Sequence, residues 1–193
     1  MIDKRLLKTI IKDSQRTQRN WNLDKTIPKE DIELLKLSVS ECPSKQNLIW
    51  YNVTFVTNKN IIKKIYQQTD GFTYSFDPLK TTTNSQTLAN MLVIFSDDKD
   101  VKKDIKISDT DDTLISIGIS SAYLNYTAHL LGYKTGYCAC FDKIKVGKII
   151  DRTDLRLIVG IGYPDETKDR RQHHLDDFIY PSFDKKINIK EIV

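Results

Sequence analysis

The sequence contains little cysteine, proline or glycine. Its 193 residues include 3 Cys, 5 Pro and 7 Gly. Three cysteines cannot all pair within one chain, so the fold does not depend on a disulfide framework. The low Pro and Gly content excludes collagen-like and low-complexity classes, and a hydrophobic fraction of 39% excludes a wholly disordered chain. We therefore expect one packed domain over residues 1–193, because this length suits a single ordinary domain.

The sequence also lacks a strong excess of charge and a long uninterrupted apolar run. Its 30 Lys and Arg residues against 26 Asp and Glu residues give a net charge of +4, which is too small to indicate a nucleic-acid partner. The most apolar stretch, residues 114–131, is broken by polar side chains and is expected to be a buried helix, with no membrane partner. No apolar leader follows Met1, so we expect the chain to start there and the protein to be cytoplasmic, with reduced cysteines.

Helices and buried strands are expected to alternate. Apolar residues at helical spacing predict helices over residues 3–14, 28–42 and 59–69. Strand patterns occur at four places, of which the continuous apolar run 91–95 is typical of a central strand buried on both faces. The other strands are predicted at residues 52–57, 135–140 and 155–161. The pattern predicts an α+β or α/β domain with a central sheet.

The longest predicted helix, residues 113–131, is apolar almost all the way round and ends before Gly132. Such a helix must be covered on all sides, either in the middle of the fold or in a subunit interface. The charged segment 97–112 before it is expected to be a solvated loop or a lid, and residues 70–86 are also expected to form a loop. We expect the two tyrosines of the helix, Tyr123 and Tyr126, to pack in the core or the interface.

Three separated segments carry the cations and hydroxyl groups that a phosphate group requires. Each segment taken alone also fits an ordinary solvated surface. The segments contain Arg16, Thr17 and Arg19, then Pro43, Ser44, Lys45 and Asn47, then Lys168, Arg170 and Arg171.

Taken in order, these segments resemble the FMN-dependent nitroreductase family. QRTQRNW, residues 15–21, is similar to that family's Arg-Arg-Ser-x-Arg opening, and CPSKQN, residues 42–47, to its Ala-Pro-Ser-x-x-Asn loop. Residues 118–142 resemble its central helix and the loop that reaches the flavin ring, and LIVGIGYPDE, residues 157–166, resembles its penultimate strand. The resemblance implies an α+β, nitroreductase-like fold with a central mixed β-sheet flanked by helices, a long buried central helix and a homodimer. Residues 182–193 form a tail that is a candidate for exchange between the subunits.

The resemblance also implies a set of FMN-binding residues. Arg19 would lie near flavin N1 and O2, Asn84 would contribute an amide at the pyrimidine edge, and the backbone of Ala139 and Cys140 would approach N5 and O4. Residues 43–47 would reach the cofactor from the neighbouring subunit. The full set is Arg16, Thr17, Arg19, Pro43, Ser44, Lys45, Asn47, Asn84, Ala139, Cys140, Arg170 and Arg171.

The activity that the resemblance implies is a ping-pong reaction. NAD(P)H would deliver hydride to flavin N5, and a nitroaromatic, quinone or similar acceptor would then take the electrons, without a catalytic side chain. Gln15 departs from the family's usual Arg, and Leu48-Ile49-Trp50 replaces its usual continuation. These departures leave open a non-catalytic flavin-binding or interaction protein. Flavin reductase and dehalogenase reactions on the same fold also remain open.

A metal site is not expected. Cys138, Cys140 and His129 could suggest one, but no CxxC pair accompanies them, and structural zinc requires four well-spaced ligands. The pair His173-His174 is expected to lie on the surface.

Overall fold

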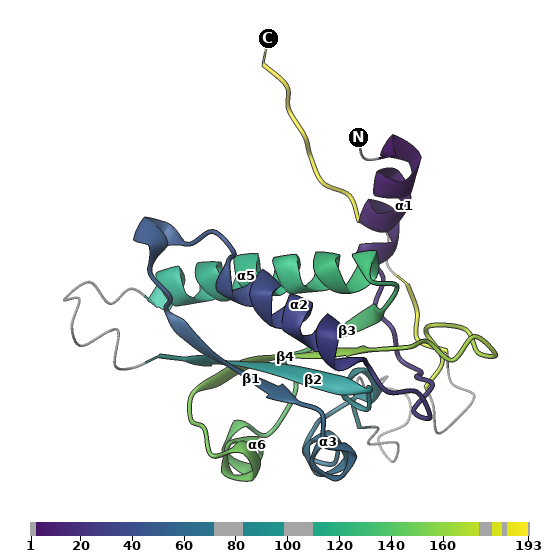
Figure 1. The fold of residues 1–193 in the computed structure, drawn as a ribbon, viewed down its shortest axis with the longest axis vertical. Helices are drawn as coiled ribbons and strands as arrows, with labels where there is room; N and C mark the ends of the chain where they lie inside the picture. Colours follow the sequence, from purple (N-terminus) through teal and green to yellow (C-terminus); the bar gives the residue numbers. More distant parts are fainter. Residues whose placement is uncertain (1–2, 72–82, 99–109, 174–178, 183–184, 193) are drawn as a thin grey trace.

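Five α-helices and four strands make up the described part of the chain (Figure 1). The structure is a computed structural model that describes residues 3–71, 83–98, 110–173, 179–182 and 185–192. The helices are α1 (Lys4–Ser14), α2 (Lys29–Ser40), α3 (Lys59–Tyr66), α5 (Thr110–Leu130) and α6 (Lys143–Ile150). The strands are β1 (Tyr51–Val56), β2 (Met91–Asp97), β3 (Lys134–Cys138) and β4 (Leu155–Gly162), and two short 3-10 helices are η1 (Lys45–Asn47) and η2 (Ser85–Thr87).

Most of the predicted elements are confirmed to within a few residues, but helix α6 was missed. Its start was readable from the sequence, because Asp142 stands directly before it and its carboxylate accepts hydrogen bonds from the backbone N–H groups of Ile144 and Lys145. Such a side chain satisfies N–H groups that have no partner within the helix.

The sheet has the strand order β1-β2-β4-β3, and all three neighbouring pairs are antiparallel. The prediction of a mixed sheet was therefore wrong for the described strands. The mixed sheet was implied by the resemblance to the nitroreductase family, and β2 and β3 do run in the same direction. However, β4 lies between them and pairs with both, so no parallel pair forms.

Helices cover both faces of the sheet (Figure 1). Helices α2 and α5 pack on one face, where Leu35 and Leu124 meet Phe95 of β2. Helices α3 and α6 pack on the other face, where Ile62 and Val146 belong to a second apolar cluster. Strand β2 is buried on both faces, as the run 91–95 predicted.

Three glycines leave a flat floor on one face of the sheet, and residues 85–90 lie on it. Gly136 of β3 pairs with Gly160 of β4, and Gly162 follows two residues later on the same face. A Cβ atom at Gly136 would lie 2.8 Å from the Gln86 Cβ, and one at Gly160 would lie 2.0 Å from the Gln86 backbone oxygen. At Gly162 it would lie 2.0 Å from the Asn90 Oδ1. The absent side chains therefore place η2 against the sheet.

Helix α5 is only partly covered within one chain. It ends near Gly132, whose φ of +87° suits glycine, as predicted. Tyr123 is 46% exposed and Ile115 is 58% exposed, so the expectation of cover on all sides is not met by this chain alone. Tyr123 is accordingly not a core residue of the single chain.

Helix α5 begins earlier than the sequence suggested. Asp112 was assigned to a solvated loop or lid over residues 97–112, but it belongs to the first turn of α5 and is 8% exposed. Its carboxylate accepts a hydrogen bond of 2.8 Å from the Lys45 Nζ. Asp97 at the other end of that segment is the last residue of β2, where Arg156 binds its carboxylate with two donors. Residues 99–109 of the predicted lid lie outside the described residues.

His173 is also not a surface residue. It is 1% exposed, and its Nε2 lies 3.2 Å from the Thr83 backbone oxygen. The Tyr180 ring lies beside it, with the two ring centroids 6.4 Å apart. Its neighbour His174 lies outside the described residues.

His129 lies buried where α5 meets α1, and we expect it to make stability depend on pH. Its Nδ1 donates a hydrogen bond of 2.9 Å to the Asn125 backbone oxygen, which leaves the buried Nε2 without a hydrogen-bond partner. Burial lowers the pKa of His129, and Lys134 lowers it further, against opposing contributions from the Asn125 hydrogen bond and Asp13.

Since the unfolded chain binds a proton at His129 more readily than the folded chain, the free energy of unfolding should fall as the pH drops below about 6.5. Above that pH the stabilisation is fully present. Urea denaturation at pH 5.5 and pH 7.5 measures the difference, and His129→Gln should reduce it. An unchanged pH dependence in the variant would contradict this assignment.

Candidate functional site

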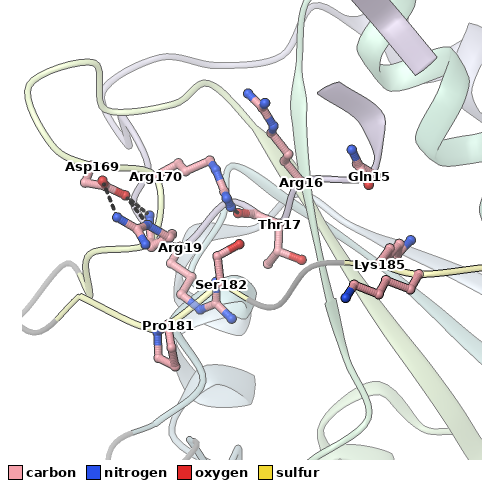
Figure 2. Close-up of a pocket in the computed structure, with 11 residues that line it drawn as sticks. Gln15, Arg16, Thr17, Arg19, Asp169, Arg170, Pro181, Ser182 and Lys185 are labelled. Atoms are coloured by element: carbon pink, nitrogen blue, oxygen red, sulfur yellow. Dashed lines mark hydrogen bonds and ion pairs between the residues drawn. The ribbon is translucent and has the colours of Figure 1, made fainter. Parts of the chain in front are cut away.

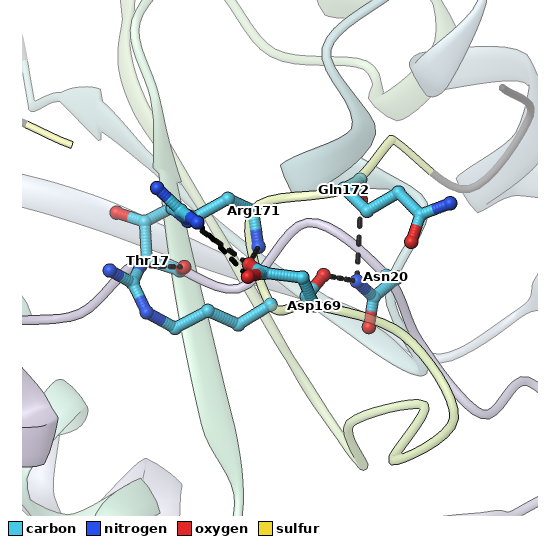
Figure 3. Close-up of polar contacts among 6 residues, drawn as sticks. Thr17, Asn20, Asp169, Arg171 and Gln172 are labelled. Carbon is cyan, nitrogen blue, oxygen red and sulfur yellow. Dashed lines mark hydrogen bonds and ion pairs between the residues drawn. The ribbon is translucent and has the colours of Figure 1, made fainter. Parts of the chain in front are cut away.

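The segment after α1 and the loop 169–172 lie side by side at one end of the sheet. The Arg19 backbone N–H donates to the Arg170 backbone oxygen at 3.0 Å, and the Arg170 Nη1 donates to the Thr17 backbone oxygen at 3.2 Å. Figure 3 shows the Asn20 side chain donating to the backbone oxygens of Asp169 and Gln172. Residues 149 to 153 positions apart in sequence are thereby held together by backbone and side-chain contacts.

The floor of this region is the edge strand β3. The Gln18 backbone N–H donates to the Thr135 backbone oxygen at 2.8 Å. A Cβ atom at Gly136 would lie 2.8 Å from the Gln18 backbone oxygen, so the glycine also permits this close approach. The segment 16–20 therefore follows the edge of the sheet.

A cationic cavity of about 1040 Å³ opens between these two segments and the C-terminal segment. Figure 2 shows Arg16 and Arg19 extending in different directions on either side of Thr17, Arg170 beside Thr17, and Lys185 on the C-terminal segment. The lining residues are Gln15, Arg16, Thr17, Arg19, Asp169, Arg170, Arg171, Pro181, Ser182, Lys185 and Lys186. Six of these carry positive charge and one carries negative charge.

The environment of two of the arginines disfavours their positive charge. Burial lowers the pKa of Arg19, and it also lowers the pKa of Arg170, with further lowering from Arg16 and Arg171. Neither Arg19 nor Arg170 forms an ion pair with an acidic side chain in the described part of the chain. A buried positive charge favours an anion beside it, so this arrangement is suited to bind a phosphate group.

Arg171 is already paired. Its Nε and Nη2 atoms each lie 3.1 Å from an Asp169 carboxylate oxygen, and its backbone N–H donates to the same carboxylate at 2.8 Å. Hydrogen bonds from Arg171 lower the pKa of Asp169 to about 2, and the pair raises the pKa of Arg171. Asp169 thus fixes the Arg171 fork at the mouth of the cavity.

A second cavity of about 520 Å³ adjoins the first at Arg19, which lines both. Its lining residues are Arg19, Asp70, Gly71, Asn84, Ser85, Gln86, Cys140 and Tyr180. The Arg19 guanidinium carbon lies 4.6 Å from the centroid of the Tyr180 ring, a cation–π contact. One end of the combined site is therefore strongly cationic, and the other is lined by amides, a thiol and an aromatic ring.

Three loops meet at this second cavity. The Asp70 backbone N–H donates to the Cys140 backbone oxygen at 2.9 Å, and the Asn84 backbone N–H donates to the Thr69 hydroxyl at 2.8 Å. The Asn84 side chain caps η2 by accepting from the Gln86 backbone N–H at 3.1 Å. Ala139 is exposed on the same loop as Cys140.

The structure thus brings together most of the residues that the sequence singled out. Arg16, Thr17, Arg19, Arg170 and Arg171 share the first cavity, and Asn84 and Cys140 share the second with Arg19.

Residues 43–47 and Ala139 are the exceptions, although Ala139 is the neighbour of Cys140 in the chain. Helix η1 lies at the N-terminal end of α5, where Lys45 binds Asp112, whereas α1 reaches the C-terminal half of α5 through the Asn125 to Ser14 hydrogen bond of 2.8 Å. Figure 1 shows the two regions at opposite ends of α5. Within one chain, Pro43, Ser44, Lys45 and Asn47 therefore line neither cavity.

Several site residues were missed from the sequence. Asp169 could have been found, because an Asp two residues before an Arg commonly accepts from its backbone N–H. Gln86, Tyr180, Lys185 and Lys186 carried no such signal, since only tertiary contacts bring them to the cavities.

No protein-family model and no curated protein sequence matches the chain. Solved structures match over most of its length. A nitroreductase family protein from Clostridium novyi is 17% identical with a TM-score of 0.67, over 85% of this chain and 89% of that one. A nitroreductase family protein from Streptococcus pneumoniae is 14% identical with a TM-score of 0.68, over 93% and 96%. An FMN-dependent nitroreductase from Clostridium difficile is 17% identical with a TM-score of 0.62, over 80% and 86%.

These similarities identify the fold as nitroreductase-like, an α+β fold with a four-stranded antiparallel sheet. The same fold was implied by the resemblance of the sequence segments. Among the described residues, no helix combines the length and apolar character needed to cross a membrane. The described residues also contain no cluster of three His, Cys, Asp or Glu side chains arranged to hold a metal ion.

Proposed function

We propose that the protein is an FMN-dependent oxidoreductase that accepts electrons from NAD(P)H and passes them to a nitroaromatic, quinone or similar small molecule. The observation that carries this proposal is the pair of adjoining cavities at Arg19. One is suited to a phosphate group, and the other has the polar edge and aromatic wall that suit a heteroaromatic ring. A structural neighbour from Staphylococcus epidermidis, 16% identical with a TM-score of 0.63 over 90% of this chain and 91% of that one, is a proposed NAD(P)H:FMN oxidoreductase.

The residues present fit FMN in three respects. The partly buried guanidinium groups of Arg19 and Arg170 lack acidic partners in the described chain and would bind the phosphate and the pyrimidine edge. The side-chain amide of Gln86 faces the second cavity. Small side chains at Ala139 and Cys140 would let backbone come close to a ring. When bound, FMN supplies the electron-transfer chemistry, so the protein has to bind it, orient it and admit the substrates.

The arginines would bind different groups of FMN. Arg170 and Arg16 would bind the phosphate, with Arg171 held ready by Asp169. Arg19 would stabilise negative charge on the pyrimidine edge, which favours the reduced cofactor. Asn84, which caps η2, would bind the same edge.

We further propose that two chains form a homodimer. The exposed apolar side chains of α5 would pack in its interface, where they would lose contact with water. In such a dimer, residues 43–47 of one chain would reach the cofactor of the other, which accounts for their distance from both cavities of their own chain. The apolar residues Ile187, Ile189 and Ile192 are strongly exposed on the C-terminal segment and would pack on the partner.

The test is an absorbance spectrum of the purified protein with added FMN. We expect a yellow protein with one FMN per chain, whose flavin bleaches on anaerobic addition of NADH or NADPH. Sedimentation equilibrium should give twice the chain mass. A protein that does not bind FMN would contradict the proposal.

A non-catalytic flavin-binding protein is the second candidate. Gln15, which stands where the resembled family has Arg, lines the cationic cavity, so one phosphate-binding cation is absent there. Bound FMN that neither NADH nor NADPH reduces would favour this alternative, and steady-state NAD(P)H oxidation with menadione would favour the enzyme.

A further inference from the structure

The Cys140 thiol lies exposed at the second cavity, in the turn that joins β3 to α6. Its backbone is held firmly, since its carbonyl oxygen accepts from the Asp70 N–H at 2.9 Å and lies 3.5 Å from the Cys138 Sγ. The backbone of Cys140 is therefore held at the cavity wall.

The other two cysteines are shielded. Cys42 is buried, and its Sγ lies 3.2 Å from the Val39 backbone oxygen and 3.3 Å from the Tyr51 hydroxyl. Cys138 is 1% exposed, and burial raises its pKa to about 12. Because the thiolate is the nucleophilic form of cysteine, Cys138 is poorly reactive in the folded chain.

Independently of the thiol, Gln86 indicates that the cavity takes a polar ligand. Gln86 is 8% exposed, its stem is packed over Gly136, and its side-chain amide makes no hydrogen bond in the described part of the chain. An amide that no protein group satisfies is available to hydrogen-bond a polar ligand that enters the cavity. The amide lines the same cavity as Cys140.

The other residues that line this cavity, and its volume, limit the chemical class of ligand that fits it. The Arg19 guanidinium carbon lies 4.6 Å from the centroid of the Tyr180 ring. A flat ring of a ligand can therefore lie beside an aromatic and a cationic group. A carbonyl oxygen of the same ligand can accept a hydrogen bond from the Gln86 amide. A volume of about 520 Å³ is enough for a compound of one or two rings. Quinones combine a flat ring, carbonyl acceptors and a carbon that is reactive toward thiols.

We propose that Cys140 is a covalent modification site for quinones that bind in this cavity. The Cys140 sulfur forms a bond to the ring carbon adjacent to a carbonyl-bearing carbon, and the C=C π bond at that position breaks. The thiol proton and the proton displaced from the attacked carbon both end on the two ring oxygens. The product is a hydroquinone thioether that contains all the atoms of the thiol and the quinone, and no external oxidant is needed.

The consequence for the protein rests on the proposed function. Because the cofactor ring is proposed to occupy this cavity, a quinone can enter it and react with Cys140 only in chains that lack FMN. Each such event would block the cavity against the cofactor ring. Quinones would then inactivate the FMN-free protein, whereas nitroaromatic compounds, which lack the reactive ring carbon, would not.

The experiment follows modification of the reduced, FMN-free protein by 1,4-naphthoquinone, with intact mass and peptide mapping. We expect one adduct per chain, at Cys140, with Cys42 and Cys138 unmodified. The rate should saturate with quinone concentration, because binding precedes bond formation. A rate that rises linearly without saturation would mean only an exposed surface thiol and would overturn the proposal, as would first modification at Cys42 or Cys138.

Two variants sharpen the test. Cys140→Ser should form no adduct, and treating the FMN-free variant with quinone should not weaken its FMN binding. Gln86→Met should raise the half-saturating quinone concentration about two- to tenfold, the effect of one neutral hydrogen bond, without changing the limiting rate. An unchanged half-saturating concentration would show that the amide does not bind the quinone, which would overturn the proposed binding mode.

FMN provides the link to the proposed function. FMN at saturation should slow the modification of Cys140 at least about tenfold, and the modified protein should no longer bind FMN. If the unmodified protein binds no FMN, the proposed function fails while saturable modification still supports the thiol site. If FMN binds and the rate of modification is unchanged, the site proposed for Cys140 is wrong and the proposed function stands.

Discussion

The substitution Gly160→Ala is expected to destabilise the protein by about 3 kcal/mol or more, at the upper end of the effects of overpacking a core. Gly160 lies in the middle of β4, which pairs with β2 on one side and β3 on the other. The added Cβ would lie 2.0 Å from the Gln86 backbone oxygen and 3.1 Å from the Ala89 Cβ. The first contact is with backbone, so no side-chain rotation relieves it, and η2 would have to leave the sheet.

Urea denaturation of the wild type and the variant measures this effect. Gly118→Ala is the matched control, because a Cβ at Gly118 meets nothing within 4 Å and the residue lies inside α5. That control should be neutral or stabilising by up to about 1 kcal/mol, since Ala favours a helix over Gly. Because Gln86 lies in η2 and Asn84 caps it, Gly160→Ala should also weaken FMN binding. Equal stability of the two variants would show that η2 does not pack as described.

The substitution Arg170→Gln should weaken FMN binding about ten- to a hundredfold, since a hydrogen bond to a charged group contributes about 1.5 to 3 kcal/mol. Arg170 is partly buried, repelled by Arg16 and Arg171, and held toward the cavity by its hydrogen bond to the Thr17 backbone oxygen. Its charge is thus available to a phosphate group without first breaking an ion pair.

Fluorescence titration of FMN measures the affinity. Lys148→Gln is the matched control, because it removes the same charge from α6, which packs on the face of the sheet opposite α2 and α5 (Figure 1). The control should bind FMN as the wild type does. If both variants lose affinity equally, the effect comes from net charge rather than from a contact at the cavity. If neither loses affinity, Arg170 does not bind the phosphate.

The sequence predicted most elements well, because local periodicity is strong in them. The apolar run 91–95 became the doubly buried strand β2, and Gly132 ended α5. The predictions failed where pairing partners decide the outcome. Whether β2 and β3 are neighbours depends on where β4 inserts, and no local pattern encodes that insertion. Asp112 looked solvated because its own segment is charged, but Lys45, 67 positions away, pairs with it.

For the candidate site, too, the sequence predicted local features but not the contacts between distant segments. Local motifs identified the arginines of residues 16–19 and 170–171, since like charges and hydroxyl groups cluster within each short segment. They could not show that Arg19 lines two cavities or that Asp169 forms an ion pair with Arg171. They also could not show that Gln86 and Tyr180 line the second cavity. Those relations arise from strand order and from the glycine floor that seats η2.

By itself, the sequence determined the helices, the strands and the chemical character of each binding segment, because side-chain periodicity and charge act over neighbouring residues. Only the tertiary structure decided which segments meet. Backbone contacts between distant strands and loops set the distances at which charges and amides can act on one ligand, and these contacts have no signature within any single segment.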